Sequence, residues 1–394
     1  MEQFDVSPYP PRAAAAPYMP PQRRGGLAVA AWVLAALVAL LLGLITLVII
    51  GFGTGPVPFL IGLVVAALPV PVYVTLVLWI DRYEAEPLWM LATAFFWGAL
   101  VATFFAIVVN SLGAAFVHEA FDAEAASFFG TVISAPLVEE CAKAFALFAL
   151  FFWKRDEFDG VLDGIVYAAM VGLGFAMTEN IKYYGEAVLE GNAAGVFVVR
   201  GVFSPFAHPL FTSMTGIGLG LARQSRGRAV KLTAPVIGLA LAVLLHGAWN
   251  GTVYLGSRME SGALILLTYF IVMVPIFAGL LTAVVLALRH EGRVLREHLW
   301  RDCERGVFSR EEYLRLCSLR ARAGASFDAL TRGGVAHWRA RRQLNGLASE
   351  LAFHRSRVAR GITARDGSDA QREAGYVRQI HELCAQLGGG RAAR

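Results

Sequence analysis

Apolar runs of about 20 residues, separated by short polar breaks, fill this sequence from residue 27 to residue 288. A helix rises about 1.5 Å per residue, so a run of this length spans the roughly 30 Å hydrocarbon core of a bilayer. The composition agrees, because 57% of the residues are hydrophobic and 16% are charged. The pattern therefore predicts an all-α, polytopic membrane protein. We expect eight spans, at residues 27–52, 57–80, 88–112, 127–153, 161–184, 197–222, 232–253 and 262–288.

Basic residues lie on one side of this predicted bundle. They occupy alternate loops, on the side of the C-terminal segment, whereas opposite loops such as GFGTGP and HEAFDAEAAS are neutral or acidic. Because cytoplasmic loops are enriched in lysine and arginine, and the number of spans is even, we expect a multi-pass cell-membrane protein with both termini in the cytoplasm. Residues 1–26 are rich in proline and are predicted to be a disordered cytoplasmic N-terminus with no cleavable signal peptide.

Residues 289–394 form a strongly basic segment, with 21 of the 35 basic residues and 12 of the 30 acidic ones. Ser309, with Glu312 three residues later, is a candidate capping box, and apolar residues then recur at helical spacing. We expect a basic helical cytoplasmic tail. It is either a regulatory or partner-binding domain or an amphipathic extension on the anionic inner leaflet, and we favour the extension. No recognised nucleic-acid-binding motif accompanies the charge, so nucleic acid is not an expected partner.

Ionisable residues lie inside four of the predicted spans. Such residues cost at least about 2.5–3.5 kcal/mol at the bilayer centre, so they mark functional sites by default. Their depths below the predicted external ends overlap between roughly 8 and 17 Å, so one pocket can contain them. Pro136, Pro205 and Pro209 lie beside them and predict broken helices, which are tolerated where they line a cavity. The polar residues are Glu139, Glu140 and Lys143 in the fourth span, Glu179 and Asn180 in the fifth, His208 in the sixth, and His246 and Asn250 in the seventh.

This cluster suits hydrolysis of an amide bond within the membrane. A glutamate near histidines can deprotonate a water molecule, and a second acid can protonate the leaving group. His246 and Asn250 lie four residues apart on one helix face, where the amide can donate a hydrogen bond to a developing oxyanion. The spacing leaves open whether Glu139 or Glu140 is the base, because Lys143 can pair with either.

The sequence leaves a metal-dependent mechanism open as well. His208, His246 and Glu140 are candidate ligands for a divalent metal such as zinc, whose bound water would attack the substrate. A mechanism without a metal is the alternative. The same cluster also suits a non-proteolytic protein, either a membrane carrier or a protein-binding scaffold, or an ion pair that locks the bundle. No repeat relates the two halves of the sequence, which counts against a carrier.

The ordered motifs resemble one family. EECAK, DGIVYAAMVGLGFAMTENIKYY, HPLFTSMTG and HGAWN, together with DRYEAEP after the second span, are similar to the PrsW family over residues 57–255. This is a group of bacterial membrane proteases within the wider superfamily of CAAX prenyl proteases and bacteriocin-immunity-type proteins. No H-E-x-x-H or G-x-S-G motif points to another class of intramembrane protease. One departure is Ala85, where the family usually has proline.

The resemblance implies an intramembrane protease with a membrane-embedded protein substrate. Family members are similar in role to the site-1 protease that cuts a single-span anti-sigma factor on its external side, in regulated intramembrane proteolysis. The wider superfamily associates an H-x-x-x-N pair with the oxyanion, and His246 and Asn250 match it. We therefore expect catalytic roles for Glu139, Glu140, His208, His246 and Asn250, and supporting roles for Lys143, Glu179 and Asn180.

Overall fold

The computed structural model describes residues 26–83, 85–155, 157–361 and 367–389, so the predicted N-terminal segment up to residue 25 lies outside it. Every regular element in the described part is helical, which confirms the predicted all-α class. The membrane part comprises α1 (Gly26–Thr54), α2 (Pro56–Ala67), α3 (Val70–Ile80), α4 (Leu88–Phe96), η1 (Trp97–Ala102), α5 (Thr103–Ala120), α6 (Ala123–Phe128), η2 (Phe129–Ser134), α7 (Ala135–Trp153), α8 (Val161–Leu189), α9 (Ala193–Phe197), η3 (Val198–Phe203), α10 (Ala207–Gln224), α11 (Arg228–Arg258), α12 (Gly262–Thr268), η4 (Tyr269–Met273) and α13 (Val274–Glu304), where η denotes a π-helical segment. It is followed by α14 (Arg310–Leu316), α15 (Leu319–Ala359) and α16 (Asp369–Gly389).

Seven helices in the described part are long and apolar enough to cross a membrane. The fourth predicted span corresponds to residues 123–153, where α6, η2 and α7 follow one another without a break. Glu139, Glu140 and Lys143 make this stretch less apolar than the other seven, but it packs against α5, α8, α10 and α11 in the same bundle. The polytopic architecture is therefore confirmed, with seven apolar spans and one charged helix where eight spans were predicted. The seven are Val29–Thr54, Pro56–Ile80, Leu88–Ala120, Val161–Leu189, Ala193–Gln224, Arg228–Arg258 and Gly262–Glu304.

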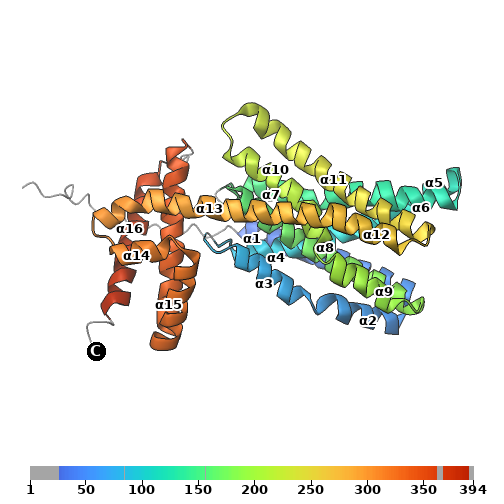
Figure 1. The fold of residues 1–394 in the computed structure, drawn as a ribbon, viewed down its shortest axis with the longest axis horizontal. Helices are drawn as coiled ribbons and strands as arrows, with labels where there is room; N and C mark the ends of the chain where they lie inside the picture. Colours follow the sequence, from blue (N-terminus) through green and yellow to red (C-terminus); the bar gives the residue numbers. More distant parts are fainter. Residues whose placement is uncertain (1–25, 84, 156, 362–366, 390–394) are drawn as a thin grey trace, which may run out of the picture.

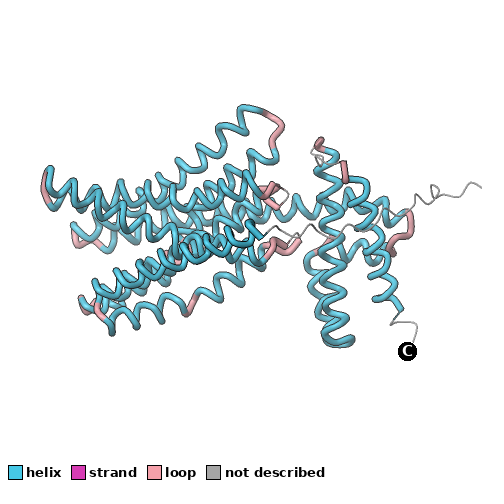
Figure 2. Tube along the Cα trace, turned by 180° about the vertical axis from the view of Figure 1, so that it is seen from behind, coloured by secondary structure: helices cyan, strands magenta, loops and turns pink. Residues whose placement is uncertain are grey.

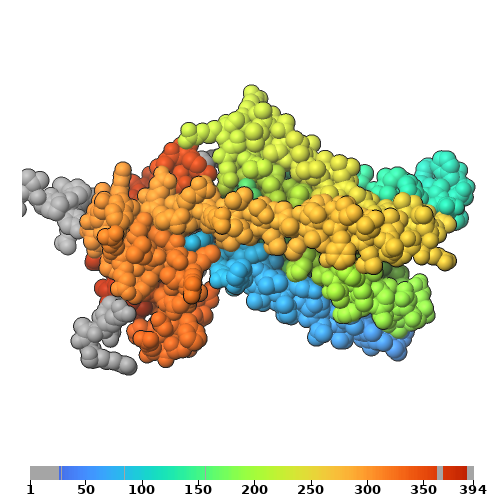
Figure 3. Space-filling model, viewed as in Figure 1, coloured from blue at the N-terminus to red at the C-terminus, as the bar shows by residue number. Residues whose placement is uncertain are grey.

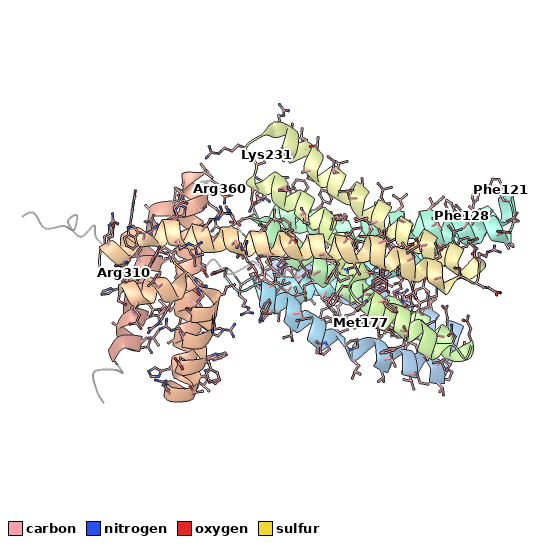
Figure 4. All side chains as sticks on the ribbon, in the orientation of Figure 1. Phe121, Phe128, Met177, Lys231, Arg310 and Arg360 are labelled. Carbon is pink, nitrogen blue, oxygen red and sulfur yellow. The ribbon has the colours of Figure 1, made fainter. Side chains whose placement is uncertain are left out.

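The membrane helices lie along the long axis of the molecule, and the C-terminal helices stand across that axis at one end (Figure 1, Figure 2). Lys231, Arg310 and Arg360 lie toward or beyond this end, and Phe121 and Phe128 lie at the opposite one (Figure 4). We call these the basic end and the distal end. The basic end carries the loops whose charge predicts a cytoplasmic location.

Helix α8 is the centre of the bundle. Of its most apolar stretch, 89% is buried, against 17–28% for the other six apolar spans, because α2, α3, α4, α7 and α10 surround it. Glycines let α10 approach closely: a Cβ added at Gly164 would lie 2.1 Å from the carbonyl oxygen of Gly216, and one at Gly172 would lie 2.7 Å from the nitrogen of Pro209. Small residues commonly mediate such crossings in membranes. The crossing at Gly172 therefore fixes the first turn of α10, which carries His208.

Helix geometry is irregular beside the polar cluster, but of the three prolines only Pro205 lies at a break, and Pro136 and Pro209 lie in the first turns of α7 and α10. The π-helical segment η2 ends at Ser134, and α7 then has Pro136 in its first turn. The segment η3 ends at Phe203, a turn containing Pro205 follows, and α10 begins at Ala207. π-Helical turns inside longer helices are frequent at functional sites.

The basic end contains a helical unit with its own core. Helix α13 continues through the predicted boundary at residue 289 and ends at Glu304. Ser309 caps α14 as predicted, since its hydroxyl accepts the N–H of Glu312 at 3.1 Å. Helix α15 reverses at Gly334, whose φ of 71° favours a residue without a Cβ, and its two halves pack together. The apolar positions of α13 to α16 cover one another, and fully buried side chains include Leu295, Leu299, Leu344, Leu351 and Ile380.

Candidate active site

Helices α7, α8, α10 and α11 bring the predicted polar residues together inside the bundle. Residues from four separate helices thus come together, as the sequence predicts. The cluster comprises Glu139, Glu140 and Lys143 of α7, Glu179 and Asn180 of α8, His208 of α10, and His246 and Asn250 of α11.

Lys143 lies at the centre of the cluster. Its Nζ atom is 2.8 Å from Oε1 of Glu140, 3.5 Å from Oε2 of Glu139 and 3.0 Å from Nδ1 of His208. It also lies 3.8 Å from the centroid of the Phe175 ring, and none of its surface is exposed. A buried ammonium requires partners of this kind. Lys143 therefore ties α7 to α8 and α10.

Glu140 is fully buried, and both of its oxygens accept hydrogen bonds. Oε1 accepts from Lys143 and from Nδ1 of His246 at 3.0 Å, and Oε2 accepts from the hydroxyl of Thr212 at 2.9 Å. A carboxylate acceptor at Nδ1 places the proton of His246 on that atom, so Nε2 keeps its lone pair. Glu140 therefore sets the orientation and tautomer of His246.

Glu139 faces a cavity of about 510 Å³. Among the described residues, its carboxylate has one polar contact within 3.5 Å, to Lys143, and its Oε2 lies 3.9 Å from Nε2 of His246. Glu140 and Lys143 do not line the cavity. Adjacent glutamates thus have different surroundings, and Glu139 is the one open to solvent-sized molecules. The cavity lining also includes Glu179, Asn180, Arg200, Ser204, His208, His246 and Asn250.

Arg200 belongs to this cluster, although sequence reasoning missed it. Its guanidinium pairs with Glu179 and donates from Nε to Oδ1 of Asn180 at 2.6 Å. Glu179 in turn accepts from Nε2 of His208 at 2.8 Å. Arg200 lies in η3, near the start of the predicted sixth span. The sequence nevertheless contained a signal for it, because an arginine within an apolar run needs an acidic or polar partner.

Asn250 lies at the cavity wall on the same helix as His246. Its amide nitrogen donates to the backbone carbonyl of Thr131 at 3.0 Å. The donor that the sequence assigns to an oxyanion is thus engaged with η2. This contact uses one of the two N–H groups of the amide, and the other can donate to a substrate.

Ligand atoms of Glu139, His208 and His246 all lie within 4.8 Å of one another, and no other group in the described part of the chain meets this condition for a metal ion. Two imidazoles and a carboxylate are a common catalytic zinc set, and His246 has the outer carboxylate that such ligands need. The carboxylate in this set is Glu139. The sequence predicted Glu140 for this role, but both oxygens of Glu140 accept hydrogen bonds from the protein. Lys143 must leave Nδ1 of His208 before that atom can bind a metal.

Carboxylates and imidazoles that are buried in a membrane bundle and face a cavity are the arrangement expected of a membrane-embedded enzyme. The model of a family described as PrsW family intramembrane metalloprotease matches residues 86–280. This protein belongs to the PrsW family and is an intramembrane peptidase. The match begins just before α4 and ends within α13, so α1 to α3 and α14 to α16 lie outside it.

Several curated relatives are named Protease PrsW. The protein of Geobacillus kaustophilus (strain HTA426) is 34% identical over 171 residues, which cover 43% of this chain and 69% of the relative. That of Bacillus subtilis (strain 168) is 32% identical over 170 residues, 43% of this chain and 72% of the relative. That of Clostridioides difficile (strain 630) is 28% identical over 193 residues, 49% and 77% respectively. No solved structure matches the chain.

Proposed function

We propose that this protein cleaves a peptide bond of a membrane protein substrate, with Glu139 as the group that activates water. The observation that carries the proposal is the contrast between the paired glutamates. Glu139 faces the cavity, whereas both oxygens of Glu140 are occupied by protein donors. A general base must reach a water molecule beside the substrate, and this position is open to Glu139.

Hydrolysis then uses groups at the cavity wall. Glu139 takes a proton from water, the water oxygen attacks the substrate carbonyl carbon, and the carboxylic acid so formed returns the proton to the leaving amine. The amide of Asn250 donates its second N–H to the oxygen that gains negative charge. His246 presents the lone pair of Nε2 to the cavity, so the donor role falls to Asn250. This H-x-x-x-N pair supports kinship with the wider superfamily named above.

A divalent metal such as zinc suits the donor set of Glu139, His208 and His246. When bound, it would polarise the substrate carbonyl and activate water, and Glu139 would then be a ligand and not the base. Glu140 and Glu179 contact the two imidazoles and hold their rings in place with or without the ion. The family description supports a metal-dependent reaction.

We propose a single-span membrane protein as the substrate, such as an anti-sigma factor cut at an external, site-1 position. The cavity lining includes Ser127, Gly130 and Glu186, which belong to the distal parts of α6, η2 and α8. The cavity therefore extends toward the distal end, and the distribution of basic residues predicts that this end is external. A membrane carrier or a protein-binding scaffold is less well supported, because the relatives are named proteases.

The test is cleavage of candidate single-span substrates by the full-length protein in liposomes. Wild type is compared with Glu139→Gln, Glu140→Gln and His208→Ala, and the exposed Glu190→Gln is the matched control. We expect slower cleavage by the first three variants, most of all by Glu139→Gln, and wild-type cleavage by the control. Wild-type rates in all four variants would show that the site is wrong.

The same assay decides the metal question. A chelator should abolish cleavage, and re-addition of zinc or another divalent ion should restore it. Cleavage that is unaffected by exhaustive chelation would establish the metal-free mechanism.

A further inference from the structure

A second cavity lies where α13 leaves the membrane bundle at the basic end. Its volume is about 250 Å³, and it is distinct from the active-site cavity, with which it shares no lining residue. Figure 3 shows α13 crossing this junction on the surface, from the bundle to the C-terminal helices. We call this cavity the groove, and it is lined by Tyr83, Val285, Leu288, Arg289, Gly292, Arg296 and Leu319.

The α13 residues of this groove form one helix face, because they recur at intervals of three and four. The face is apolar within the bundle, at Val285 and Leu288, and becomes basic beyond it, at Arg289 and Arg296. Gly292 lies between the two arginines. A Cβ at Gly292 would be 3.1 Å from the hydroxyl of Tyr83 and 3.6 Å from Nη1 of Arg296, so the glycine keeps the groove open.

The two groove arginines have no acidic partner among the described residues, and both are exposed. Some other arginines of the basic end are paired, as Arg341 is with Glu312 and Arg355 is with Asp302. An unpaired guanidinium pair next to an apolar surface is complementary to an anion that carries a hydrocarbon chain.

The position of Tyr83 indicates the level of the groove within the membrane. This residue lies just after α3 ends at Ile80, and its hydroxyl donates to the carbonyl oxygen of Cys317 at 3.3 Å. The groove therefore lies where apolar spans give way to polar chain, which is the headgroup level of a bilayer. Arginines at this level extend toward phosphates while their stems cover apolar surface.

We propose that this groove binds an anionic phospholipid. The headgroup phosphate contacts Arg289 and Arg296, and the first part of an acyl chain lies against Val285 and Leu288. Basic pockets between membrane helices at this level are known to bind such headgroups. Because Leu319 begins α15 and Tyr83 precedes α4, a bound lipid also fills the junction between the membrane bundle and the C-terminal helices.

The test uses the full-length protein in detergent and native mass spectrometry with equal amounts of phosphatidylglycerol and phosphatidylcholine of the same chain length. We expect wild type to retain phosphatidylglycerol preferentially. The double variant Arg289→Gln/Arg296→Gln should bind it about 30-fold more weakly, the effect expected for two basic contacts. Gly292→Val should weaken binding without a change of charge, because its side chain fills the groove.

The matched control is Arg301→Gln/Arg310→Gln, which removes the same charge from exposed positions outside the groove and should bind phosphatidylglycerol as wild type does. Wild-type binding by the groove variant would overturn the proposal. An equal loss in the control would also overturn it, because general surface charge would then explain the preference. Competition by inorganic phosphate at the same concentration would identify a free-anion site instead of a lipid site.

Discussion

Nδ1 of His246 on α11 lies 3.0 Å from Oε1 of Glu140 on α7. Glu140 also accepts from Lys143 and Thr212, whereas its neighbour Glu139 faces the cavity. Adjacent helical residues point about 100° apart, so one glutamate meets protein and the other meets the space for substrate. Removing the charge of Glu139 should therefore have a different effect from removing the charge of Glu140.

Glu139→Gln should abolish activity and preserve the fold. We expect cleavage at least 100-fold slower, because the water loses its base. Glu140→Gln should lower activity and also stability, by about 3 kcal/mol, because Lys143 and His246 lose a charged acceptor in a buried site. Cleavage rates in liposomes and thermal unfolding in one detergent measure the two effects. Equal destabilisation by both substitutions would contradict the assignment.

Arg200→Met should reduce cleavage at least tenfold, because Glu179 then lacks its guanidinium partner and holds His208 less firmly. Arg200→Lys should recover part of the activity, since an ammonium can pair with Glu179 but cannot match the planar guanidinium fork that also reaches Asn180. The same liposome assay applies.

The control for Arg200 is Arg258→Met, which removes an exposed ion pair with Glu124 near the distal end. Exposed pairs contribute little to stability, so this variant should behave as wild type. If Arg200→Lys were no more active than Arg200→Met, the guanidinium itself would be needed at Glu179.

The sequence predicted the membrane bundle well because apolar length is a local property. It also predicted that Glu139, His208 and His246 meet, since depth follows from residue counts along straight helices. It did not predict which glutamate faces the cavity. The rotation of α7 depends on its neighbours, above all on the donors Thr212 and His246, and those contacts are long-range.

Two other features were beyond the sequence for related reasons. The π-helical segment η3 and the turn at Pro205 bring Arg200 over Glu179, and helical periodicity does not describe such irregular backbone. The continuation of α13 to Glu304 depends on packing against α14 and α15. Charge alone suggested a boundary at residue 289.

Gly172→Ala should destabilise the protein and slow cleavage. The added methyl would lie 2.8 Å from the carbonyl carbon of His208 and 2.7 Å from the nitrogen of Pro209, so α8 and α10 must separate. Overpacking of this kind costs about 1–3 kcal/mol. Gly279→Ala is the matched control, because no atom lies within 4 Å of its added Cβ. That change should be neutral or stabilise the helix by up to about 1 kcal/mol. Equal thermal unfolding midpoints for the two variants would show that the crossing tolerates a methyl group.

Asp81 lies just beyond α3 at the basic end, where burial raises the pKa of its carboxyl from 3.8 to about 7. It accepts the backbone N–H of Glu86 at 2.8 Å. The folded state therefore binds a proton here more readily than the unfolded state does. The charged form opposes folding, and this penalty is absent below about pH 4, grows as the pH rises, and is complete above about pH 7.

Asp81→Asn removes the penalty and keeps an oxygen that can accept from Glu86. The thermal unfolding midpoint of the variant should equal that of wild type near pH 4, rise above it as the pH increases to about 7, and stay above it at pH 8. Asp163 and Glu291 lie close enough to Asp81 to be affected by its charge, so the difference between variant and wild type also contains their response, which has the same sign. The exposed Asp328→Asn controls for the loss of one charge. A difference between variant and wild type that does not change from pH 4 to pH 8 would mean that Asp81 keeps the same protonation state on folding.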